Sequence, residues 1–325
     1  MLVQNTKLQQ GMRLNRKVSG RIKNWIRIVR KDFVLNKVLI LMTLPVLAYY
    51  IIFHYLPMFG VVIAFKRYMP FIGIWDSPWV GLDNFKAFFT DPYFPRSVRN
   101  TLMINFYQLI FGFPAPILLA LLLNEVKKSV FKRTIQSVTY LPHFISMVVQ
   151  CGIIANFFAL KGPINDILSL MGMERTVFLM KPEYFRSIYV GTGIWASIGW
   201  SSIIYIAALS RIDTELYEAA TIDGANRWRQ FLAVTLPGIM PMIVIMLILA
   251  IGRMMSEGAE KIILLYNPLT YETSDIISSY VYRRGLLQAD FSYSSAVGLA
   301  NSVVNFSLLV LANAVSRRVN ETSLW

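Results

Sequence analysis

Six long stretches of the chain contain no Asp, Glu, Lys or Arg, and they alternate with segments that carry charges. Each stretch exceeds the roughly 20 residues that an α-helix needs to cross the hydrocarbon core of a bilayer. Backbone groups find no water partners there, so such stretches form helices. The pattern therefore predicts an all-α polytopic membrane protein with six transmembrane helices. The charge-free stretches are 38–65, 100–124, 134–160, 187–210, 230–252 and 291–316.

These stretches divide the chain into three expected parts. Residues 1–37 form a basic N-terminal segment, residues 38–316 form a transmembrane domain, and residues 317–325 form a short tail. Apolar residues between Ile22 and Val29 recur at helical spacing, which favours a helix lying on the membrane surface over a solvated tail. Allowing for polar ends, the expected spans are about 38–62, 100–124, 136–160, 187–210, 233–255 and 293–316.

The net charge of +14 is unevenly distributed along the chain. With the N-terminus in the cytoplasm, nearly all of the excess of Lys and Arg over Asp and Glu falls on the inner segments, which are 1–37, 125–133, 211–229 and 317–325. Positively charged loops stay on the cytoplasmic side, so we expect both termini there. The basic charge is thus a membrane-orientation signal. Nucleic-acid binding is disfavoured, because it requires a soluble basic face with interleaved aromatic residues.

The sequence lacks the usual patterns of catalytic and metal sites. Its two histidines, His54 and His143, lie on separate expected spans, whereas a metal site requires several converging ligands. The chain also contains no Walker A phosphate-binding loop and so does not hold ATP by that route. We therefore expect no enzyme activity, no metal and no cofactor in this chain itself.

The longest polar interruption on the expected inner side is residues 215–237, which carry charges of both signs. Asp213 or Thr214 is placed to cap the start of a helix here. Gly224 suits the left-handed end of that helix, and Asn226 suits the cap of a return helix. The sequence predicts a short helix, a sharp turn and a second helix.

One face of this first helix is thin, because Ala219 and Ala220 have small side chains, and Glu218 beside them offers a charge to a partner. Such a helix suits a plug that enters a groove on another protein. From its physics alone, a solvated amphipathic loop is an equal alternative.

Residues 218–237 contain a Glu-Ala-Ala triplet, a Gly after three further residues and a closing Leu-Pro pair. This series resembles the EAA loop of ABC-importer permeases, with DGAN at 223–226 matching the usual continuation. The family usually has Ile where this chain has Val234, a mild departure. The matching positions are Glu218, Ala219, Ala220, Gly224, Val234, Leu236 and Pro237.

Other segments are similar to carbohydrate permeases. The final one is similar to the branch that handles complex oligosaccharides and polysaccharides, which includes AlgM- and Lpl-type permeases. The similarity covers residues from about 38 to 316. These segments are GLDNF at 81–85, DPYF at 91–94, the pair Asn100-Thr101, and KIILLYNPLTYETSDIISSYVYRRGL at 261–286.

The resemblance implies a type I importer in the bacterial cytoplasmic membrane. Such a complex has a second permease subunit, commonly a paralogue, two ATPase subunits that bind ATP and Mg, and an extracytoplasmic solute-binding protein. The cargo would be an oligo- or polysaccharide, and the loop helix would sit in a cleft of the ATPase. The resemblance implies that the coupling residues are Glu218, Ala219, Ala220, Asp223 and Gly224.

Sugar sites combine apolar and aromatic surfaces with a few polar groups. Residue type and depth predict a substrate path containing Gln150, Trp195, Trp200, Tyr205, Arg253, Asn301 and Asn305. Arg253 would suit an acidic sugar such as a uronide. Each residue also has a structural interpretation: the aromatic residues as core, the Asn pair as interhelical hydrogen bonds, and Arg253 in an ion pair. An importer of an amino acid, peptide or phosphate compound is the alternative function.

Overall fold

The computed structural model describes residues 35–255, 258–320 and 323–324. These residues are largely helical, and their only β-type pairings are two isolated bridges. The all-α class is confirmed. Five helical segments are long and apolar enough to cross a membrane, or six if a bent pair is one span. The surface helix predicted within residues 1–37 lies almost entirely outside the described residues.

The chain divides into two compact units, Met1–Val62 and Ile63–Trp325. The described part of the first unit is an apolar helix. It makes up most of the first candidate span, Lys37–Phe65, whose last three residues belong to the second unit. Its elements are α2 (Lys37–Tyr50), η1 (Ile51–Tyr55), α3 (Leu56–Met58) and the beginning of η2 (Phe59–Phe65).

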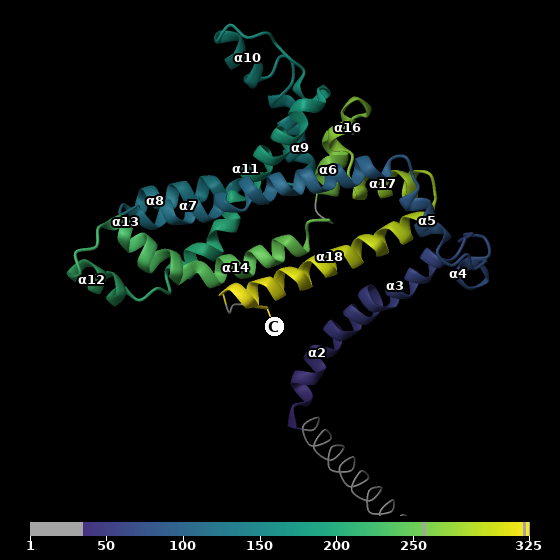
Figure 1. The fold of residues 1–325 in the computed structure, drawn as a ribbon, viewed down its shortest axis with the longest axis horizontal. Helices are drawn as coiled ribbons and strands as arrows, with labels where there is room; N and C mark the ends of the chain where they lie inside the picture. Colours follow the sequence, from purple (N-terminus) through teal and green to yellow (C-terminus); the bar gives the residue numbers. More distant parts are fainter. Residues whose placement is uncertain (1–34, 256–257, 321–322, 325) are drawn as a thin grey trace, which may run out of the picture. The chain divides into compact units, whose positions relative to one another are not determined.

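The second unit contains the other candidate spans (Figure 1). The long segments are α6 (Phe94–Tyr107) with η3 (Gln108–Gly112) and α7 (Pro114–Glu125), α11 (Pro182–Leu209), α13 (Arg227–Gln230) with η6 (Phe231–Thr235) and α14 (Leu236–Gly252), and α18 (Phe291–Asn320). The shorter elements are α4 (Gly73–Asp76), α5 (Asp83–Phe89), α8 (Ser129–Tyr140), η4 (Leu141–Phe144), α9 (Met147–Phe157), α10 (Pro163–Leu170), η5 (Phe178–Met180), α12 (Thr214–Ile222), α15 (Ala259–Leu265), η7 (Pro268–Thr270), α16 (Tyr271–Ser274), α17 (Ile277–Tyr282) and η8 (Arg283–Leu287).

Three of the five candidate spans contain a wide π-type turn, and in each a proline stands two residues after the end of the turn. The prolines are Pro57 after η1, Pro114 after η3 and Pro237 after η6. A proline ring clashes with the carbonyl four residues earlier and offers no N–H to it. In each case that carbonyl belongs to the wide turn, whose looser bonding accommodates the ring. The prolines therefore shape these spans without ending them.

The expected span at 136–160 is not a straight helix. The segments Ser129–Phe144 and Met147–Phe157 meet at a bend of 105°. Ser146 caps the second helix, and the Gln150 side chain donates hydrogen bonds to the carbonyls of Pro142 (2.9 Å) and Ile145 (2.8 Å). The Pro142 carbonyl also accepts from the Ile145 N–H at 3.2 Å, so the Gln150 side chain adds bonds to the backbone where the regular helical pattern is interrupted.

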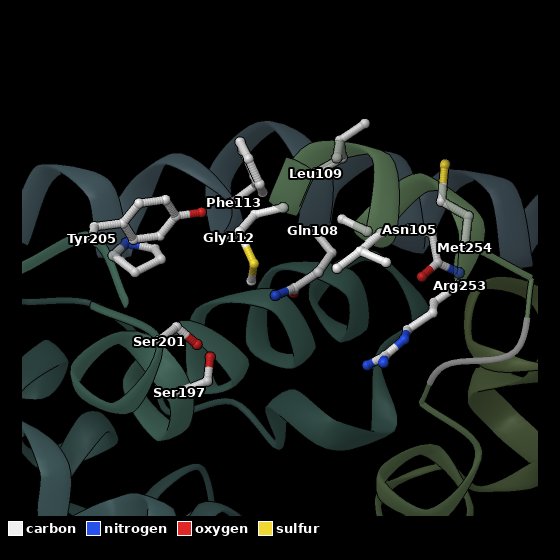
Figure 2. Close-up of a pocket in the computed structure, with 14 residues that line it drawn as sticks. Asn105, Gln108, Leu109, Gly112, Phe113, Ser197, Ser201, Tyr205, Arg253 and Met254 are labelled. Carbon is white, nitrogen blue, oxygen red and sulfur yellow. The ribbon is translucent and has the colours of Figure 1, made fainter. Parts of the chain in front are cut away.

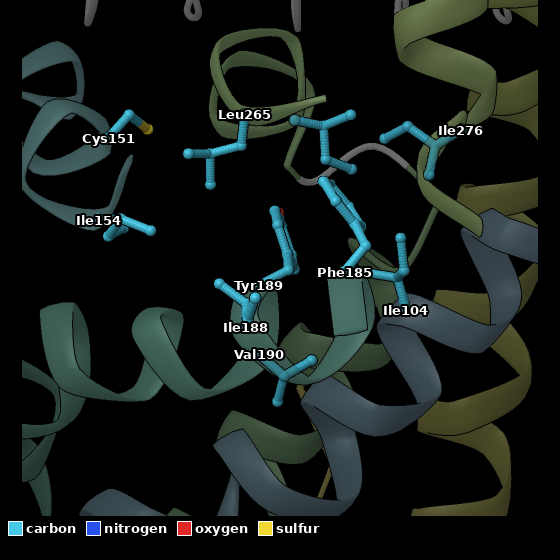
Figure 3. Packing of buried hydrophobic residues seen from close by; sticks show 10 residues of the cluster. Ile104, Cys151, Ile154, Phe185, Ile188, Tyr189, Val190, Leu265 and Ile276 are labelled. Atoms are coloured by element: carbon cyan, nitrogen blue, oxygen red, sulfur yellow. The ribbon is translucent and has the colours of Figure 1, made fainter. Parts of the chain in front are cut away.

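Helix α11 lies at the centre of the packing in the second unit. It contacts α7, α8 and α14, and close approach to α8 requires Gly199, because an added Cβ would collide with the carbonyl of Thr139. Its first half contributes Phe185 and Tyr189 to a buried cluster that joins α6, α9 and α15 (Figure 3).

The bundle formed by α6–α7, α14 and α18 has two distinct ends (Figure 1). At one end lie α12 and α13, where Arg227 Nη1 pairs with Glu125 Oε2 at 3.0 Å. At the opposite end, α16 and α17 contact α6, while α5 packs on α18. These two ends carry the polar features described below.

Candidate functional site

A cavity of about 280 Å³ lies between α6–α7, α11 and α14 (Figure 2). The polar ends of Gln108, Ser201 and Arg253 point into the same space in this view. Its polar lining residues are Asn105, Gln108, Ser197, Ser201, Tyr205 and Arg253. Its remaining lining residues are Leu109, Gly112, Phe113, Pro116, Met246, Leu249, Ala250 and Met254.

Helical spacing explains how the polar groups converge. Ser197, Ser201 and Tyr205 follow one another at intervals of four on α11, so they share one face. On the opposite wall, Gln108 opens the wide turn η3, and its side chain folds across Gly112, where an added Cβ would collide with the amide. Gly112 is therefore needed for Gln108 to adopt this position.

The cavity is polar but carries little charge. Among its lining residues Arg253 alone is charged, and it stands at the C-terminal cap of α14. No carboxylate among the described residues forms an ion pair with it. A carbohydrate path is typically lined by amides, hydroxyls and apolar surface, and this cavity has those groups.

A second cation lies behind the Gln108 wall. Lys261 on α15 is buried, and its Nζ donates to the Tyr189 carbonyl (2.8 Å) and Thr192 Oγ1 (2.9 Å). Gly193 lies between Lys261 and Gln108, because an added Cβ would be 3.5 Å from Lys261 Nζ and from Gln108 Oε1. Burial lowers the pKa of Lys261 to about 8. Its charge is therefore sensitive to mildly alkaline pH.

Two of the seven predicted path residues, Tyr205 and Arg253, line the cavity. The other five lie elsewhere. Gln150 supports the bend between α8 and α9. Trp200 is partly exposed and stacks on His143 with ring centroids 4.6 Å apart, and Trp195 is 40% exposed. A substrate contact by any of the five stays a prediction.

Asn301 and Asn305 lie one turn apart on α18 and both bind Met255, just beyond α14. Asn301 Nδ2 donates to the Met255 carbonyl (2.8 Å), and Asn305 Oδ1 accepts from the Met255 N–H (3.0 Å). These bonds hold the end of α14 against α18. They match the interhelical interpretation of the pair.

The sequence interpretation did not include four polar lining residues, Asn105, Gln108, Ser197 and Ser201. A signal for two of them was present, because Ser197, Ser201 and Tyr205 repeat at helical spacing. The position of Gln108 depends on the wide turn before Pro114, which spacing alone does not reveal.

The loop at 215–237 has the predicted local structure. Asp213 caps α12 by accepting a hydrogen bond from the Glu215 N–H at 3.0 Å. Gly224 has a φ of +74° at the turn, and Asn226 caps α13 by accepting from the Arg229 N–H at 2.9 Å. All three predicted positions are thus confirmed as local geometry.

Three side-chain contacts hold this loop on the bundle. Tyr217 Oη lies 3.0 Å from Thr235 Oγ1 at the base of α14. Gln230 Nε2 donates to Thr221 Oγ1 at 3.0 Å, which joins α13 to α12. The Arg227–Glu125 pair joins α13 to α7, so the loop is tied to two spans, Arg227–Gly252 and Phe94–Glu125, while the outer face of α12 stays exposed.

The exposed face of α12 contains the residues that the family resemblance implies for coupling. Glu218, Ala219, Asp223 and Gly224 are exposed, and Ala220 is half-buried. Large apolar groups are exposed beside them, including Ile222 at 86% and Trp228 at 65%. Small residues flanked by exposed apolar side chains are typical of a surface that packs against another protein.

The family model of the binding-protein-dependent transport system inner membrane component matches residues 112–321. The chain belongs to this family. The match covers the cavity walls from Gly112 onward, the loop that contains α12, and α18.

Relatives extend the similarity over nearly the whole chain. Protein LplB of Bacillus subtilis is 44% identical over 94% of this chain and 96% of its own length. The polygalacturonan/rhamnogalacturonan transport system permease protein YteP of Bacillus subtilis is 44% identical over 89% of this chain and 91% of its own. A chain from the crystal structure of a bacterial alginate ABC transporter, in complex with a periplasmic protein bound to alginate pentasaccharide, has a TM-score of 0.84 and 41% identity. That match covers 90% of this chain and 99% of the other.

Proposed function

We propose that this chain is the permease subunit of an ATP-driven, solute-binding-protein-dependent importer of oligo- or polysaccharides. The observation that carries the proposal is its similarity to two saccharide transporters, YteP and the alginate transporter chain, each more than 40% identical over about nine-tenths of this chain. The chemistry of the cavity supports it, because amide and hydroxyl groups converge beside apolar walls.

The proposed orientation puts α12 and both termini in the cytoplasm. The distribution of Lys and Arg supports it, since the segments at 1–37 and 125–133 carry most of the positive excess. The end that contains α16 and α17 then faces outward, toward the solute-binding protein.

Energy for transport would come from another chain, because this sequence has no Walker A loop. We propose that α12 docks in a cleft of a partner ATPase that binds ATP and Mg, with Glu218, Ala219, Ala220, Asp223 and Gly224 at the contact. A second permease subunit would complete the translocation path. The two permease subunits would alternate between two conformations. ATP would shift the balance between them only as far as the complex binds it more tightly in one conformation than in the other.

Uptake by the reconstituted complex tests the proposed cargo. The permease pair, ATPase subunits and solute-binding protein would be placed in liposomes that contain ATP, and uptake of labelled galacturonate oligomers, maltotetraose and a mixture of amino acids would be measured. We expect ATP-dependent uptake of at least one saccharide. Uptake of amino acids without any saccharide would contradict the proposal.

Charge reversal tests the coupling surface. Glu218→Lys places a cation on the exposed face of α12, and we expect the variant to insert in the membrane normally. Its capture of the ATPase should fall at least tenfold, which corresponds to the loss of about one charge-assisted hydrogen bond. The matched control is Glu174→Lys, which makes the same charge change at an exposed site before α11. Wild-type capture and uptake by Glu218→Lys would remove the coupling assignment.

A further inference from the structure

A second, larger hollow lies at the end of the bundle opposite α12. It has a volume of about 590 Å³ and shares no lining residue with the membrane cavity. Its walls come from the start of α6, from α16 and α17, and from η8. In the proposed orientation it opens on the outer face, where the solute-binding protein delivers cargo.

Three guanidinium groups line this outer pocket, those of Arg96, Arg283 and Arg284. Two carboxylates hold them from beneath. The Asp275 side chain is 0% exposed and accepts from both Arg283 Nη1 (2.9 Å) and Arg283 Nη2 (2.6 Å), as well as from Arg96 Nη2 (3.2 Å). Asp91, whose side chain is 6% exposed, accepts from Arg284 Nη1 at 2.7 Å.

The arginines of this network reach the pocket surface, whereas two of the carboxylates that pair with them are buried beneath it. The Asp275 and Asp91 side chains are almost completely buried, whereas the Arg96, Arg283 and Arg284 side chains are 31%, 19% and 29% exposed. One lining carboxylate, Asp290, pairs with Arg284 Nε at 3.1 Å. Because the guanidinium groups are already oriented, an incoming anion does not have to order them.

Gln288 and three tyrosine rings complete the lining. Tyr93, Tyr271 and Tyr280 line the pocket and lie against its cations. The Arg96 guanidinium is 4.9 Å from the Tyr93 ring centre, and that of Arg283 is 4.4 Å from the Tyr271 ring centre. Flat aromatic faces beside oriented guanidinium groups suit a ligand that has both an apolar face and a carboxylate.

We propose that this pocket binds an acidic saccharide segment, with uronate carboxylates on the arginines and sugar faces against the tyrosines, before the cargo enters the membrane cavity. The inference rests on the proposed function for the identity of the cargo. A volume of about 590 Å³ suits sugar rings, whereas a single Asp or Glu side chain of a docked protein would leave most of it empty. A protein carboxylate is accordingly the alternative that the test must exclude.

The charge of the pocket is stable around neutral pH. Burial by itself raises the pKa of Asp91, but hydrogen bonds from Tyr280 and the Tyr93 N–H, with the Arg284 charge, outweigh it and hold that pKa below its usual value. Burial also opposes the charge on Arg283, yet its bonds to Asp275 raise its pKa. Asp91 and Arg283 therefore stay charged around neutral pH.

The decisive experiment measures binding of a fluorescent tetragalacturonate to the assembled importer in nanodiscs, without the solute-binding protein, beside neutral maltotetraose. The test variant combines Arg96→Gln with Arg284→Gln, which keeps the Arg283–Asp275 pair. The control, Arg175→Gln, removes an exposed arginine that pairs with Asp166 outside the pocket. We expect the double variant to raise the Kd for tetragalacturonate about tenfold or more, and the control to leave it unchanged.

Each other outcome overturns the inference. Equal tetragalacturonate binding by wild type and the double variant would do so, as would an equal loss of maltotetraose binding, because the site would not recognise the acid. A variant that binds tetragalacturonate normally but fails to bind the solute-binding protein would assign the pocket to protein docking. Failure of the proposed function looks different, since the wild-type complex would then import no saccharide at all.

Discussion

The membrane cavity and the outer pocket are lined by different stretches of the same span, Phe94–Glu125, and they differ in charge. Near the middle of the span, Asn105 and Gln108 line a cavity with one charged residue. Near its start, Arg96 belongs to a pocket with three arginines held by buried carboxylates. This difference in charge fits the surroundings that we propose: the cavity lies at the depth of the hydrocarbon core, and the pocket lies at the outer membrane surface.

This comparison suggests a division of labour along the path. Charges are costly within a bilayer, and strong binding there would also hold the cargo in place. Neutral amides and hydroxyls bind sugars without trapping them. At the outer end, water and paired acids stabilise arginines, so an acidic chain is best selected there and released inward.

The largest expected effect comes from the buried acid of the pocket. Asp275→Ala leaves Arg96 and Arg283 without their shared carboxylate, so we expect a loss of about 3–5 kcal/mol in stability, measured as thermal unfolding in detergent. Asp166→Ala, which breaks the exposed pair with Arg175, should cost at most about 1 kcal/mol. Equal losses in the two variants would show that Asp275 is not a central support.

Next in size is an effect of pH near the cavity. Because burial lowers the pKa of Lys261 to about 8, the folded protein binds fewer protons than the unfolded chain between about pH 8 and 10. Stability should therefore rise with pH across that window, by about 2 kcal/mol. Lys261→Met should lack this rise, whereas Arg284→Gln should keep it. A rise that persists in Lys261→Met would assign it to another group.

A smaller effect is expected from the charged residue of the cavity. Arg253→Gln should lower uptake of galacturonate oligomers about tenfold relative to neutral saccharides, because one charge-assisted contact is lost. Arg253→Lys should recover part of this preference. If Arg253→Gln lowers uptake of acidic and neutral saccharides equally, the residue does not recognise the acid.

The smallest effect concerns one hydroxyl. Tyr205→Phe removes the group that faces the cavity and keeps the buried ring, so uptake should fall about two- to fivefold with little change in unfolding temperature. Tyr205→Ala, by comparison, should destabilise the protein by about 3–5 kcal/mol, as loss of a large core ring does. A fully active Tyr205→Phe would remove the hydroxyl from the path.

Much of the fold was predictable because its signals are local. Charge-free stretches longer than a bilayer crossing determine the helices, and capping groups such as Asp213 and Asn226 determine where the helices around the loop begin. The site was less predictable. Tyr205 and Arg253, two residues of the predicted substrate path, line the cavity, and their contact with substrate stays a prediction. Asn105 and Gln108 were not in that prediction, since their convergence depends on how α6 meets α11.

The outer pocket depended still more on tertiary structure. The sequence marks residues 261–286 as similar to saccharide permeases, but it does not join Asp275 to Arg96, which lies 179 positions away. Nor does it join Asp91 to Arg284. Long-range pairs of this kind have no period that a sequence pattern reveals.

By itself the sequence determined the membrane class, the helical spans and the local geometry of the α12 loop, because bilayer thickness, proline chemistry and helix capping act over a few neighbouring residues. Only the tertiary structure decided where the third expected span bends, which polar side chains share a cavity, and which arginines gather around buried acids. Those features depend on packing between helices, and packing brings together groups whose separation along the chain carries no information.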